Sequence, residues 1–273
     1  MWGTIIGDIA GSVYEMPVDG AASIKTKDFP FWGTGCRFTD DTVTTVAVGQ
    51  ALMESRMKGQ AVTPLLCRYL RYWCRRFPGV GYGPRFIHWY ESDDMGPYGS
   101  WANGAAMRVA PAGWLADTLA EAQYLAELSA VVTHNTEEAI QGAVTVSSAI
   151  YLARAGIRRD DIRVYLQDHF YPLDRSLNEI RRDYGFTSRT SRSVPEAIEA
   201  FLESSDYEDA VRNAISLGGD TDTQAAIAGS MAEAYYGIPE RMCQKATSYL
   251  PADIHQQVER LYAYIHNRKR GLS

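Results

Sequence analysis

The sequence predicts an all-α fold. Across its 273 residues, apolar side chains recur with the three- and four-residue spacing of helices, and no segment shows the alternation that is typical of a half-buried strand. Glycine and proline stand between the helical segments, where they end one helix or begin the next. With 46% apolar and 22% charged residues, the chain can bury one large core, and we expect a single domain spanning residues 1–273.

The net charge of −6 disfavours a dedicated nucleic-acid or membrane-surface binder, although it leaves room for a local basic pocket. No run of about 18 apolar residues occurs and the first residues lack a basic signal-peptide region, so we expect a cytoplasmic protein and a monomer. The four cysteines show no metal-ligand spacing, and Cys67 and Cys74 would stand about 10 Å apart on one helix, too far for a disulfide. We therefore expect buried free thiols at Cys36, Cys67, Cys74 and Cys243.

The first helix is predicted over residues 1–15. One face carries three glycines at every fourth position, which allow close approach to another backbone: Gly3, Gly7 and Gly11. Asp8 and Glu15 are seven residues apart and therefore share one side of this helix, so both can face a common site. The helix is expected to end at Met16, because Pro17 disfavours the α conformation of the residue before it.

Loops and helices alternate along the rest of the chain. Residues 19–37, rich in glycine, lysine and aromatic residues, are expected to form a loop that covers the site as a lid. Residues 79–99 are expected to be a long irregular segment that does not match a dinucleotide fingerprint, because no strand precedes it and no helix follows it. The arginine-rich residues 170–193 are expected to lie on the surface. Helices are predicted over residues 43–57, 64–77, 119–132, 136–155, 160–169, 239–250 and 254–266, with others starting near Ser193, near Ser205 or Asp206, and after Asp220.

Two short motifs place carboxylates and hydroxyls at helix starts. Residues 38–42 read Phe-Thr-Asp-Asp-Thr, and residues 217–223 read Leu-Gly-Gly-Asp-Thr-Asp-Thr. The ordinary interpretation of the second motif is a helix cap, in which the Asp220 carboxylate accepts from the Thr223 N–H. However, the neighbouring carboxylates of Asp40 and Asp41 repel each other and are costly to bury unless a cation neutralises them.

Both motifs together favour a metal site over two independent caps. Four carboxylates and two or three hydroxyls suit one or two Mg²⁺ or Mn²⁺ ions, which prefer oxygen ligands. The motifs can share an ion pair only if their helices meet, so we predict that the helices after Asp41 and Asp222 pack side by side with their N-termini together.

A third segment, residues 99–111, is rich in small residues that let backbone amides reach a ligand at a helix start, where a phosphate group is the natural guest. His134 precedes a predicted helix. Its position leaves two interpretations equally open, a capping-loop histidine or a ligand contact.

These motifs resemble the ADP-ribosylglycohydrolase family, metal-dependent all-α hydrolases that include the glycohydrolase reactivating dinitrogenase reductase. The resemblance spans nearly the whole chain and implies a compact orthogonal helical bundle with a binuclear metal site at helix N-termini. It rests on Gly7–Gly11 with Tyr14-Glu15, on Phe38–Thr42, on Gly99-Ser100 with Asn103–Arg108, and on Ser216–Thr223.

The resemblance implies hydrolysis of a glycosidic bond at ribose C1″ of an ADP-ribosyl group on a protein or small-molecule conjugate. Glu15 and Asp41 are the implied catalytic residues; Glu15 would shuttle the proton, with Asp94 as the weaker candidate for that role. Two divalent cations, Mg²⁺ or Mn²⁺, are implied to bind Thr39, Asp40, Asp41, Asp220, Asp222 and Thr223. The ADP-ribose is expected to contact Gly99, Ser100, Asn103, Gly104 and His134, with Tyr98 or Trp101 stacking on the adenine.

Two alternatives remain open at this point. A non-catalytic ADP-ribose-binding or crystallin-like member of the fold would be expected to have lost metal ligands, whereas all six candidates are present. The acidic motifs alone would fit the metal site of a two-metal phosphoesterase as well as that of a glycohydrolase. The sequence does not choose among arginine, serine and other linkages, and nucleic acid is expected only as an ADP-ribosylated substrate.

Overall fold

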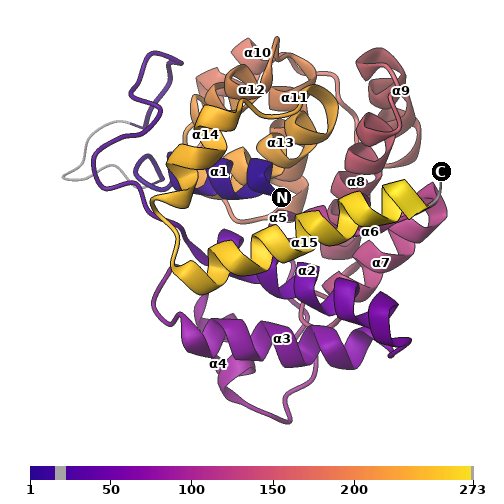
Figure 1. The fold of residues 1–273 in the computed structure, drawn as a ribbon. Coiled ribbons are helices and arrows are strands. Elements are labelled where there is room, and N and C mark those ends of the chain that lie inside the picture. Colours follow the sequence, from indigo (N-terminus) through magenta and orange to yellow (C-terminus); the bar gives the residue numbers. More distant parts are fainter. Residues whose placement is uncertain (16–22, 272–273) are drawn as a thin grey trace.

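The computed structural model describes residues 1–15 and 23–271. Within these residues the chain is helical (Figure 1), and no strand occurs apart from an isolated antiparallel bridge between Ala102 and Arg189, which confirms the predicted fold class. The helices are α1 (Trp2–Gly11), α2 (Asp40–Lys58), α3 (Val62–Arg76), α4 (Pro84–Glu91), α5 (Gly104–Met107), α6 (Ala110–Leu115), α7 (Leu119–Val131), α8 (Glu137–Arg154), α9 (Arg159–His169), α10 (Leu177–Asp183), the 3₁₀ helix η2 (Thr190–Arg192), α11 (Val194–Leu202), α12 (Tyr207–Ile215), α13 (Thr221–Tyr236), α14 (Glu240–Thr247) and α15 (Ala252–Gly271).

Helices α1 and α13 lie against each other at the centre of the fold. The glycine face of α1 makes this contact possible, because a Cβ added to any of its three glycines would overlap the backbone of α13. The facing residues are Gly3 with Gly229, Gly7 with Ala225, and Gly11 with Thr221. The predicted close backbone approach of this face is therefore confirmed, and it fixes the ends of α1 and α13 relative to each other.

The predicted packing of the two motif helices is only partly right. Helices α2 and α13 meet near their N-termini, where Thr223 Oγ1 lies 3.3 Å from Asp41 Oδ2, but they do not pack along their lengths. Instead α1 takes the flank of α13, because its glycines allow the closest approach, and α2 packs mainly against α3.

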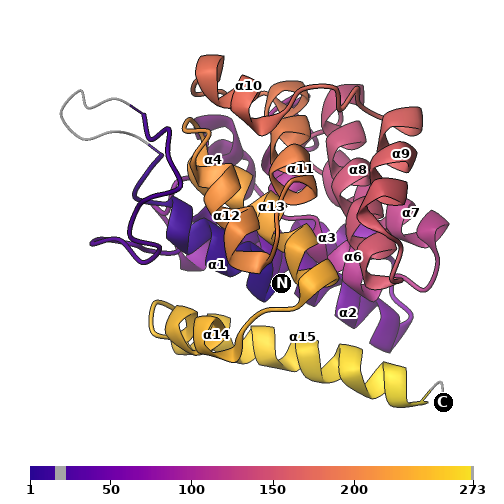
Figure 2. The ribbon, with the colours of Figure 1, turned by 90° about the horizontal axis from the view of Figure 1, so that it is seen from above.

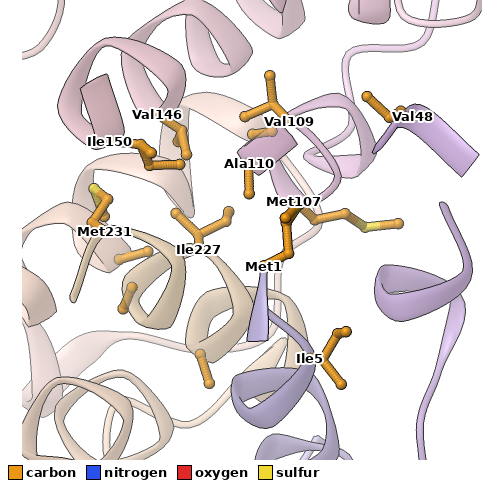
Figure 3. Packing of buried hydrophobic residues seen from close by; sticks show 14 of the residues in the cluster. Met1, Ile5, Val48, Met107, Val109, Ala110, Val146, Ile150, Ile227 and Met231 are labelled. Atoms are coloured by element: carbon orange, nitrogen blue, oxygen red, sulfur yellow. The ribbon is translucent and has the colours of Figure 1, made fainter. Parts of the chain in front are cut away.

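The remaining helices enclose this centre. Buried side chains from α1, α2, α8 and α13 form one continuous hydrophobic cluster, which includes Ile5, Val48, Ile150, Ile227 and Met231 (Figure 3). Helices α14 and α15 lie along one edge of the molecule and α10 at the opposite edge (Figure 2). No described helix has both the length and the apolar character needed to cross a membrane.

One segment predicted to be irregular contains a helix, and so does the arginine-rich segment predicted to lie on the surface. Within residues 79–99, Pro84 begins α4, and burial of Phe86, Trp89 and Tyr90 on one face stabilises it. Within the arginine-rich stretch, α10 begins with a reciprocal capping box between Ser176 and Glu179. The prediction of irregular structure is wrong at α4, because packing outweighs the glycine-rich composition. The arginine-rich stretch was predicted only to lie on the surface, and the polar side chains of α10 are exposed or half-buried.

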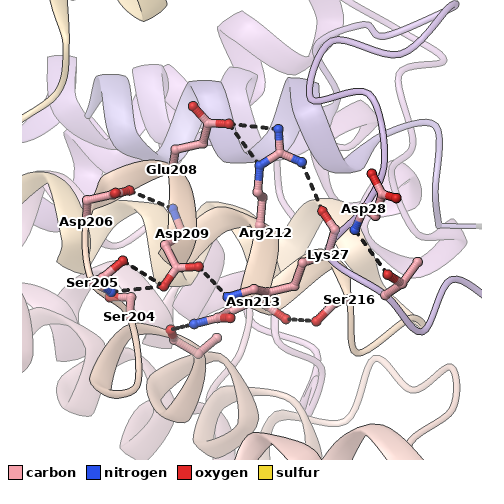
Figure 4. Close-up of polar contacts among 12 residues, drawn as sticks. Lys27, Asp28, Ser204, Ser205, Asp206, Glu208, Asp209, Arg212, Asn213 and Ser216 are labelled. Carbon is pink, nitrogen blue, oxygen red and sulfur yellow. Dashed lines mark hydrogen bonds and ion pairs between the residues drawn. The ribbon is translucent and has the colours of Figure 1, made fainter.

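The chain before α2 is fixed onto α12 (Figure 4). Arg212 donates to the backbone oxygens of Lys27 and Phe29, at 3.1 and 2.8 Å, and Lys27 forms an ion pair with Asp209. Helix α1 ends at Gly11, earlier than predicted. Residues 16–22, including the predicted stop and part of the predicted lid, lie outside the described residues.

The cysteines are free thiols, as predicted. Cys36 and Cys74 are buried. Cys67 on α3 and Cys243 on α14 are half-buried, because they lie at the edge of the hydrophobic core. The prediction of burial is therefore right for two of the four.

Candidate active site

A cavity of about 760 Å³ lies where the N-termini of α2 and α13 meet. This volume is within the range of about 300–1,000 Å³ that is typical of small-molecule sites. Its wall includes the candidates for metal binding and proton transfer, namely Glu15, Thr39, Asp40, Asp41, Asp220, Asp222 and Thr223. It also includes four of the five candidates for ADP-ribose contact, namely Ser100, Asn103, Gly104 and His134. The fifth, Gly99, and the weaker proton carrier, Asp94, do not line it, and Asp94 is exposed.

Asp8, fully buried on α1, holds the start of α2 in place. Its carboxylate accepts from the N–H and hydroxyl groups of Thr39, at 2.9 and 2.7 Å, and from the N–H and hydroxyl groups of Thr42. Burial raises the pKa of Asp8 to about 6, against the opposing effect of these hydrogen bonds. With its acceptor capacity so engaged, Asp8 positions the α2 motif.

Asp41 is buried at the centre of the acidic cluster. Its Oδ2 atom lies 3.4 Å from Thr39 Oγ1 and 3.3 Å from Thr223 Oγ1, so it links both motifs. Its Oδ1 atom is buried and has no hydrogen-bond partner among the described residues. A buried carboxylate oxygen without a partner is costly, and a cation is the natural way to satisfy it.

Asp222 joins two groups of carboxylates. Carboxylate oxygens of Asp222, Asp8 and Asp41 lie within 4.8 Å of one another, and so do those of Asp222, Glu15 and Asp220. Such spacing brings acidic oxygens from α1, α2 and α13 close enough to surround a divalent ion, and the shared Asp222 places the two groups next to each other.

The helix-cap interpretation of Asp220 does not describe the structure. Asp220 occupies the N-cap position of α13, but its side chain forms no capping hydrogen bond. The Thr223 N–H donates instead to Asp222 Oδ1 at 2.9 Å, and Asp220 Oδ2 accepts from Asn103 Nδ2 at 2.8 Å. The Asn103 side chain, predicted to contact ADP-ribose, thus holds a carboxylate, with Ser193 as its other partner.

The acids of the cluster are buried or half-buried close together, without salt bridges from the described residues that would neutralise them. None of its acids belongs to an ion pair formed within the described residues. Burial, followed by the charge of Asp8, raises the pKa of Asp40 to about 8 and that of Asp41 well above its ordinary value. Burial also raises the pKa of Asp222 and Glu15, with Asp220 as the next cause for both. These groups ionise together only when positive charge is supplied.

The far wall of the cavity is fixed by the turn before α8. Asn135 Oδ1 accepts from the Gly99 N–H at 2.8 Å, and the Thr136 hydroxyl donates to the Ser100 carbonyl at 2.9 Å. The Gly99 amide is therefore engaged within the protein. Gly104 begins α5 and packs against the buried His134 ring, where a larger residue would not fit, since a Cβ there would come within 2.9 Å of His134 Nε2.

His134 does not cap α8, because Thr136 is the N-cap and its hydroxyl accepts from the Ala139 N–H. The ring lies instead in the cavity wall with its Nδ1 atom 2.7 Å from Thr133 Oγ1. Of the two interpretations left open by the sequence, the capping one is excluded.

Comparison with known proteins assigns the chain to a family. The sequence model of the ADP-ribosylglycohydrolase family matches residues 1–271. The chain belongs to this family. The predicted resemblance is confirmed, and the protein is an ADP-ribosylglycohydrolase, an enzyme that hydrolyses glycosidic bonds.

Several curated relatives share this assignment. Human ADP-ribosylhydrolase ARH3 is 27% identical over 328 residues, covering 92% of this chain and 89% of that protein. The ADP-ribosyl-[dinitrogen reductase] glycohydrolase of Rhodospirillum rubrum is 25% identical, with 83% and 79% covered. A solved ADP-ribosylglycohydrolase-related protein complex shares the fold, with a TM-score of 0.71 at 22% identity over 97% of this chain and 94% of that one.

Sequence reasoning missed three contributors to the glycohydrolase site. Asp8 was expected only to face the site, and its four hydrogen bonds to the α2 motif were not foreseen. Gly81, with a φ of +123°, leaves room for Asp40, since a Cβ there would lie 2.6 Å from Asp40 Oδ1. Arg108, buried in the cavity wall, is visible in the sequence only as part of a motif. An acid inside an all-apolar helix and a glycine opposite an acidic motif are the signals that point to the first two.

Proposed function

We propose that this glycohydrolase releases ADP-ribose from a modified protein side chain or a small-molecule conjugate by hydrolysis at ribose C1″, with two divalent cations, Mg²⁺ or Mn²⁺. One observation carries the proposal: a buried cluster made only of carboxylate and hydroxyl oxygens, including the unpartnered Asp41 Oδ1, lines a cavity of ligand size. Hard oxygen donors are the ligands that these cations prefer.

The residues present fit the two cations. Thr39, Asp40 and Asp41 would bind from α2, and Asp220, Asp222 and Thr223 would bind from the start of α13. When bound, the cations would orient the ribose hydroxyls, offset negative charge and lower the pKa of a water molecule. Asp8 and Asn103 hold this donor set in place through their hydrogen bonds. Asp41 is central because its Oδ2 atom lies near hydroxyls from both motifs.

Glu15 is the proposed general acid and base. It lines the cavity half-buried, beside Asp220 and Asp222, and burial followed by the charge of Asp220 raises its pKa. A carboxyl group with a raised pKa can take a proton from the attacking water and return it to the leaving group. Asp94 is exposed away from the cavity wall, so the structure favours Glu15 for this role.

The proposed ADP-ribose position follows the opposite wall. The diphosphate would lie near Ser100, Gly104 and His134, which line the cavity. Trp101 is 48% exposed at the cavity wall and has the Arg189 guanidinium 5.7 Å from its ring centre, so its exposed area is available to stack on the adenine. The face of Tyr98 is occupied instead by the Arg85 guanidinium, 4.9 Å from the ring centre. The partner is an ADP-ribosylated protein or conjugate.

The linkage is decided by experiment. The relatives bear names that differ in linkage: ADP-ribosylarginine hydrolase Tri1 of Pseudomonas putida is 27% identical over 159 residues, 56% of this chain and 42% of that protein. We propose to incubate the protein with peptides ADP-ribosylated on arginine or serine and with an ADP-ribose ester, with Mg²⁺, Mn²⁺ or EDTA. Chromatography should show metal-dependent release of ADP-ribose. Release of AMP would support a phosphoesterase instead, and binding without turnover would support a non-catalytic member.

A further inference from the structure

A buried arginine that forms no ion pair within the described residues lies in the wall of the cavity. Arg108 is 1% exposed, and none of the ion pairs formed within the described residues includes it. Its Nη2 atom donates to the Ser129 carbonyl at 2.8 Å and to Thr133 Oγ1 at 2.7 Å. A guanidinium group only donates, so Thr133 Oγ1 accepts from Arg108.

The second contact of the Thr133 hydroxyl is His134 Nδ1, at 2.7 Å. The hydroxyl has a single proton. If it donates that proton to Nδ1, the Thr133 hydroxyl uses its proton and Nδ1 has a donor, so both groups are satisfied. If Nδ1 instead carries the proton and donates it, the hydroxyl accepts twice and its own proton lacks an acceptor in a fully buried position. Such an unsatisfied donor is unfavourable.

The other ring nitrogen of His134, Nε2, lies next to Gly104 in the cavity wall. His134 lines the cavity, and Nε2 has no hydrogen-bond partner among the described residues. Gly104, which also lines the cavity, carries no side chain to cover this atom. Burial, followed by the positive charge of Arg108, lowers the pKa of His134 well below its ordinary value, so the ring is neutral.

We propose that Arg108 and Thr133 are positioning residues that fix His134 as the neutral tautomer protonated on Nε2, so that the ring offers the ligand a hydrogen-bond donor. The relay runs in one direction, from the guanidinium to the hydroxyl and from the hydroxyl to Nδ1. An oxygen of the ADP-ribose would accept from Nε2–H, and this half of the inference rests on the proposed function. The tautomer itself does not.

The test combines spectroscopy with binding in the full-length protein. Long-range ¹H–¹⁵N correlation spectra of ¹⁵N-histidine-labelled protein, assigned with His134→Asn, should show an unprotonated Nδ1 and a protonated Nε2. Thr133→Val removes the hydroxyl at nearly constant volume and should give a mixture of tautomers. Its Kd for ADP-ribose and its KM should rise about tenfold with kcat within about twofold, as expected for one lost hydrogen bond made in binding. Thr133→Ser keeps the hydroxyl and should restore both the spectrum and the affinity.

A wild-type spectrum with the proton on Nδ1 would overturn the relay, and this result needs no variant to fold. A changed tautomer in Thr133→Val with unchanged ADP-ribose affinity would overturn the donor role of Nε2. The inferred wild-type tautomer together with no binding of ADP-ribose would overturn the proposed function and leave the tautomer assignment standing.

Discussion

Two sets of buried carboxylates in this chain are built in opposite ways. Glu199 on α11 is 2% exposed, and both of its oxygens accept from the Arg163 guanidinium, each at 2.7 Å. Asp41 and Asp222 are similarly buried, at 1% and 5% exposed, yet neither belongs to an ion pair within the described residues. The chain neutralises the first acid internally and leaves the second set charged or protonated.

The difference separates structure from function. A carboxylate whose two oxygens both accept from one guanidinium needs no ligand to neutralise its charge, and the pair contributes to the stability of the fold. A cluster of carboxylates that repel one another lowers the stability of the empty protein, and the proposed cations would offset that cost. The same carboxylate-to-amide substitution should therefore act in opposite directions in the two regions.

The largest expected effect is on catalysis at the acidic region. Glu15→Gln removes the proposed proton carrier and should lower kcat by roughly 10² or more. Affinity for ADP-ribose should stay within about tenfold, because the group acts on the proton and not on binding. Steady-state kinetics and calorimetric titration with ADP-ribose measure the two quantities. Unchanged turnover would transfer the role to another acid of the cavity.

The next effect is on stability at the paired region. Glu199→Gln leaves the Arg163 guanidinium without its bidentate partner and should lower the free energy of unfolding by about 2 kcal/mol. This loss in the free energy of unfolding is smaller than that expected for breaking a fully buried ion pair, because the Arg163 side chain is 30% exposed. Urea unfolding measures the loss, with Glu127→Gln at an exposed position of α7 as the matched control. A loss equal to that of the control would show that the pair adds nothing to the fold.

In the acidic region, the same kind of substitution is expected to leave the stability unchanged or to increase it. Asp222→Asn relieves like-charge repulsion, so without metal it should melt at the same temperature as wild type or higher. Its affinity for Mg²⁺ or Mn²⁺ should fall by about tenfold or more, and added metal should raise its melting temperature less than that of wild type. Calorimetric metal titration and melting curves with and without chelator test both expectations. Equal metal affinity in the two proteins would remove Asp222 from the proposed ligands.

The last expected effect is a pH dependence of the metal-free protein. The pKa of Asp40 is raised to about 8 and that of Asp8 to about 6, both above the ordinary value of 3.8. Their contribution to stability is thus fully present below about pH 4 and is lost as the pH rises through these values. The melting temperature in chelator should fall between pH 5 and pH 8, and saturating metal should reduce or abolish that fall. A metal-free protein that becomes more stable over this interval would contradict the pKa assignments.

How much the sequence predicts depends on how local each interaction is. Asp40, Asp41, Asp220 and Asp222 were found because helix-start motifs are local patterns, and all four line one cavity. The role of Asp8 was missed because its partners lie 31 and 34 residues away. The contact between Asn103 and Asp220 spans 117 residues, so Asn103 was assigned to the ligand instead.

The same argument applies to whole elements. Helix α3 was predicted because its aromatic stripe has a helical period, whereas α4 was hidden between glycines and depends on burial of Phe86 and Trp89. The sequence also does not predict which helices pack against each other. The glycines of α1 indicate a close neighbour, but nothing in their spacing says that this neighbour is α13.

The pairing of α1 with α13 has a consequence for how the protein is made. The Thr221 hydroxyl donates to the Gly11 carbonyl across 210 residues, so the first helix leaves the ribosome long before its partner exists. During that interval, the glycine face of α1 lacks the helix that it packs against. Closing so long a loop is slow, and exposed apolar helices invite aggregation. The contact between α1 and α13 can therefore form only after α13 has been synthesised. The acidic cluster, which includes residues from α1 and from α13, can assemble only at that late stage.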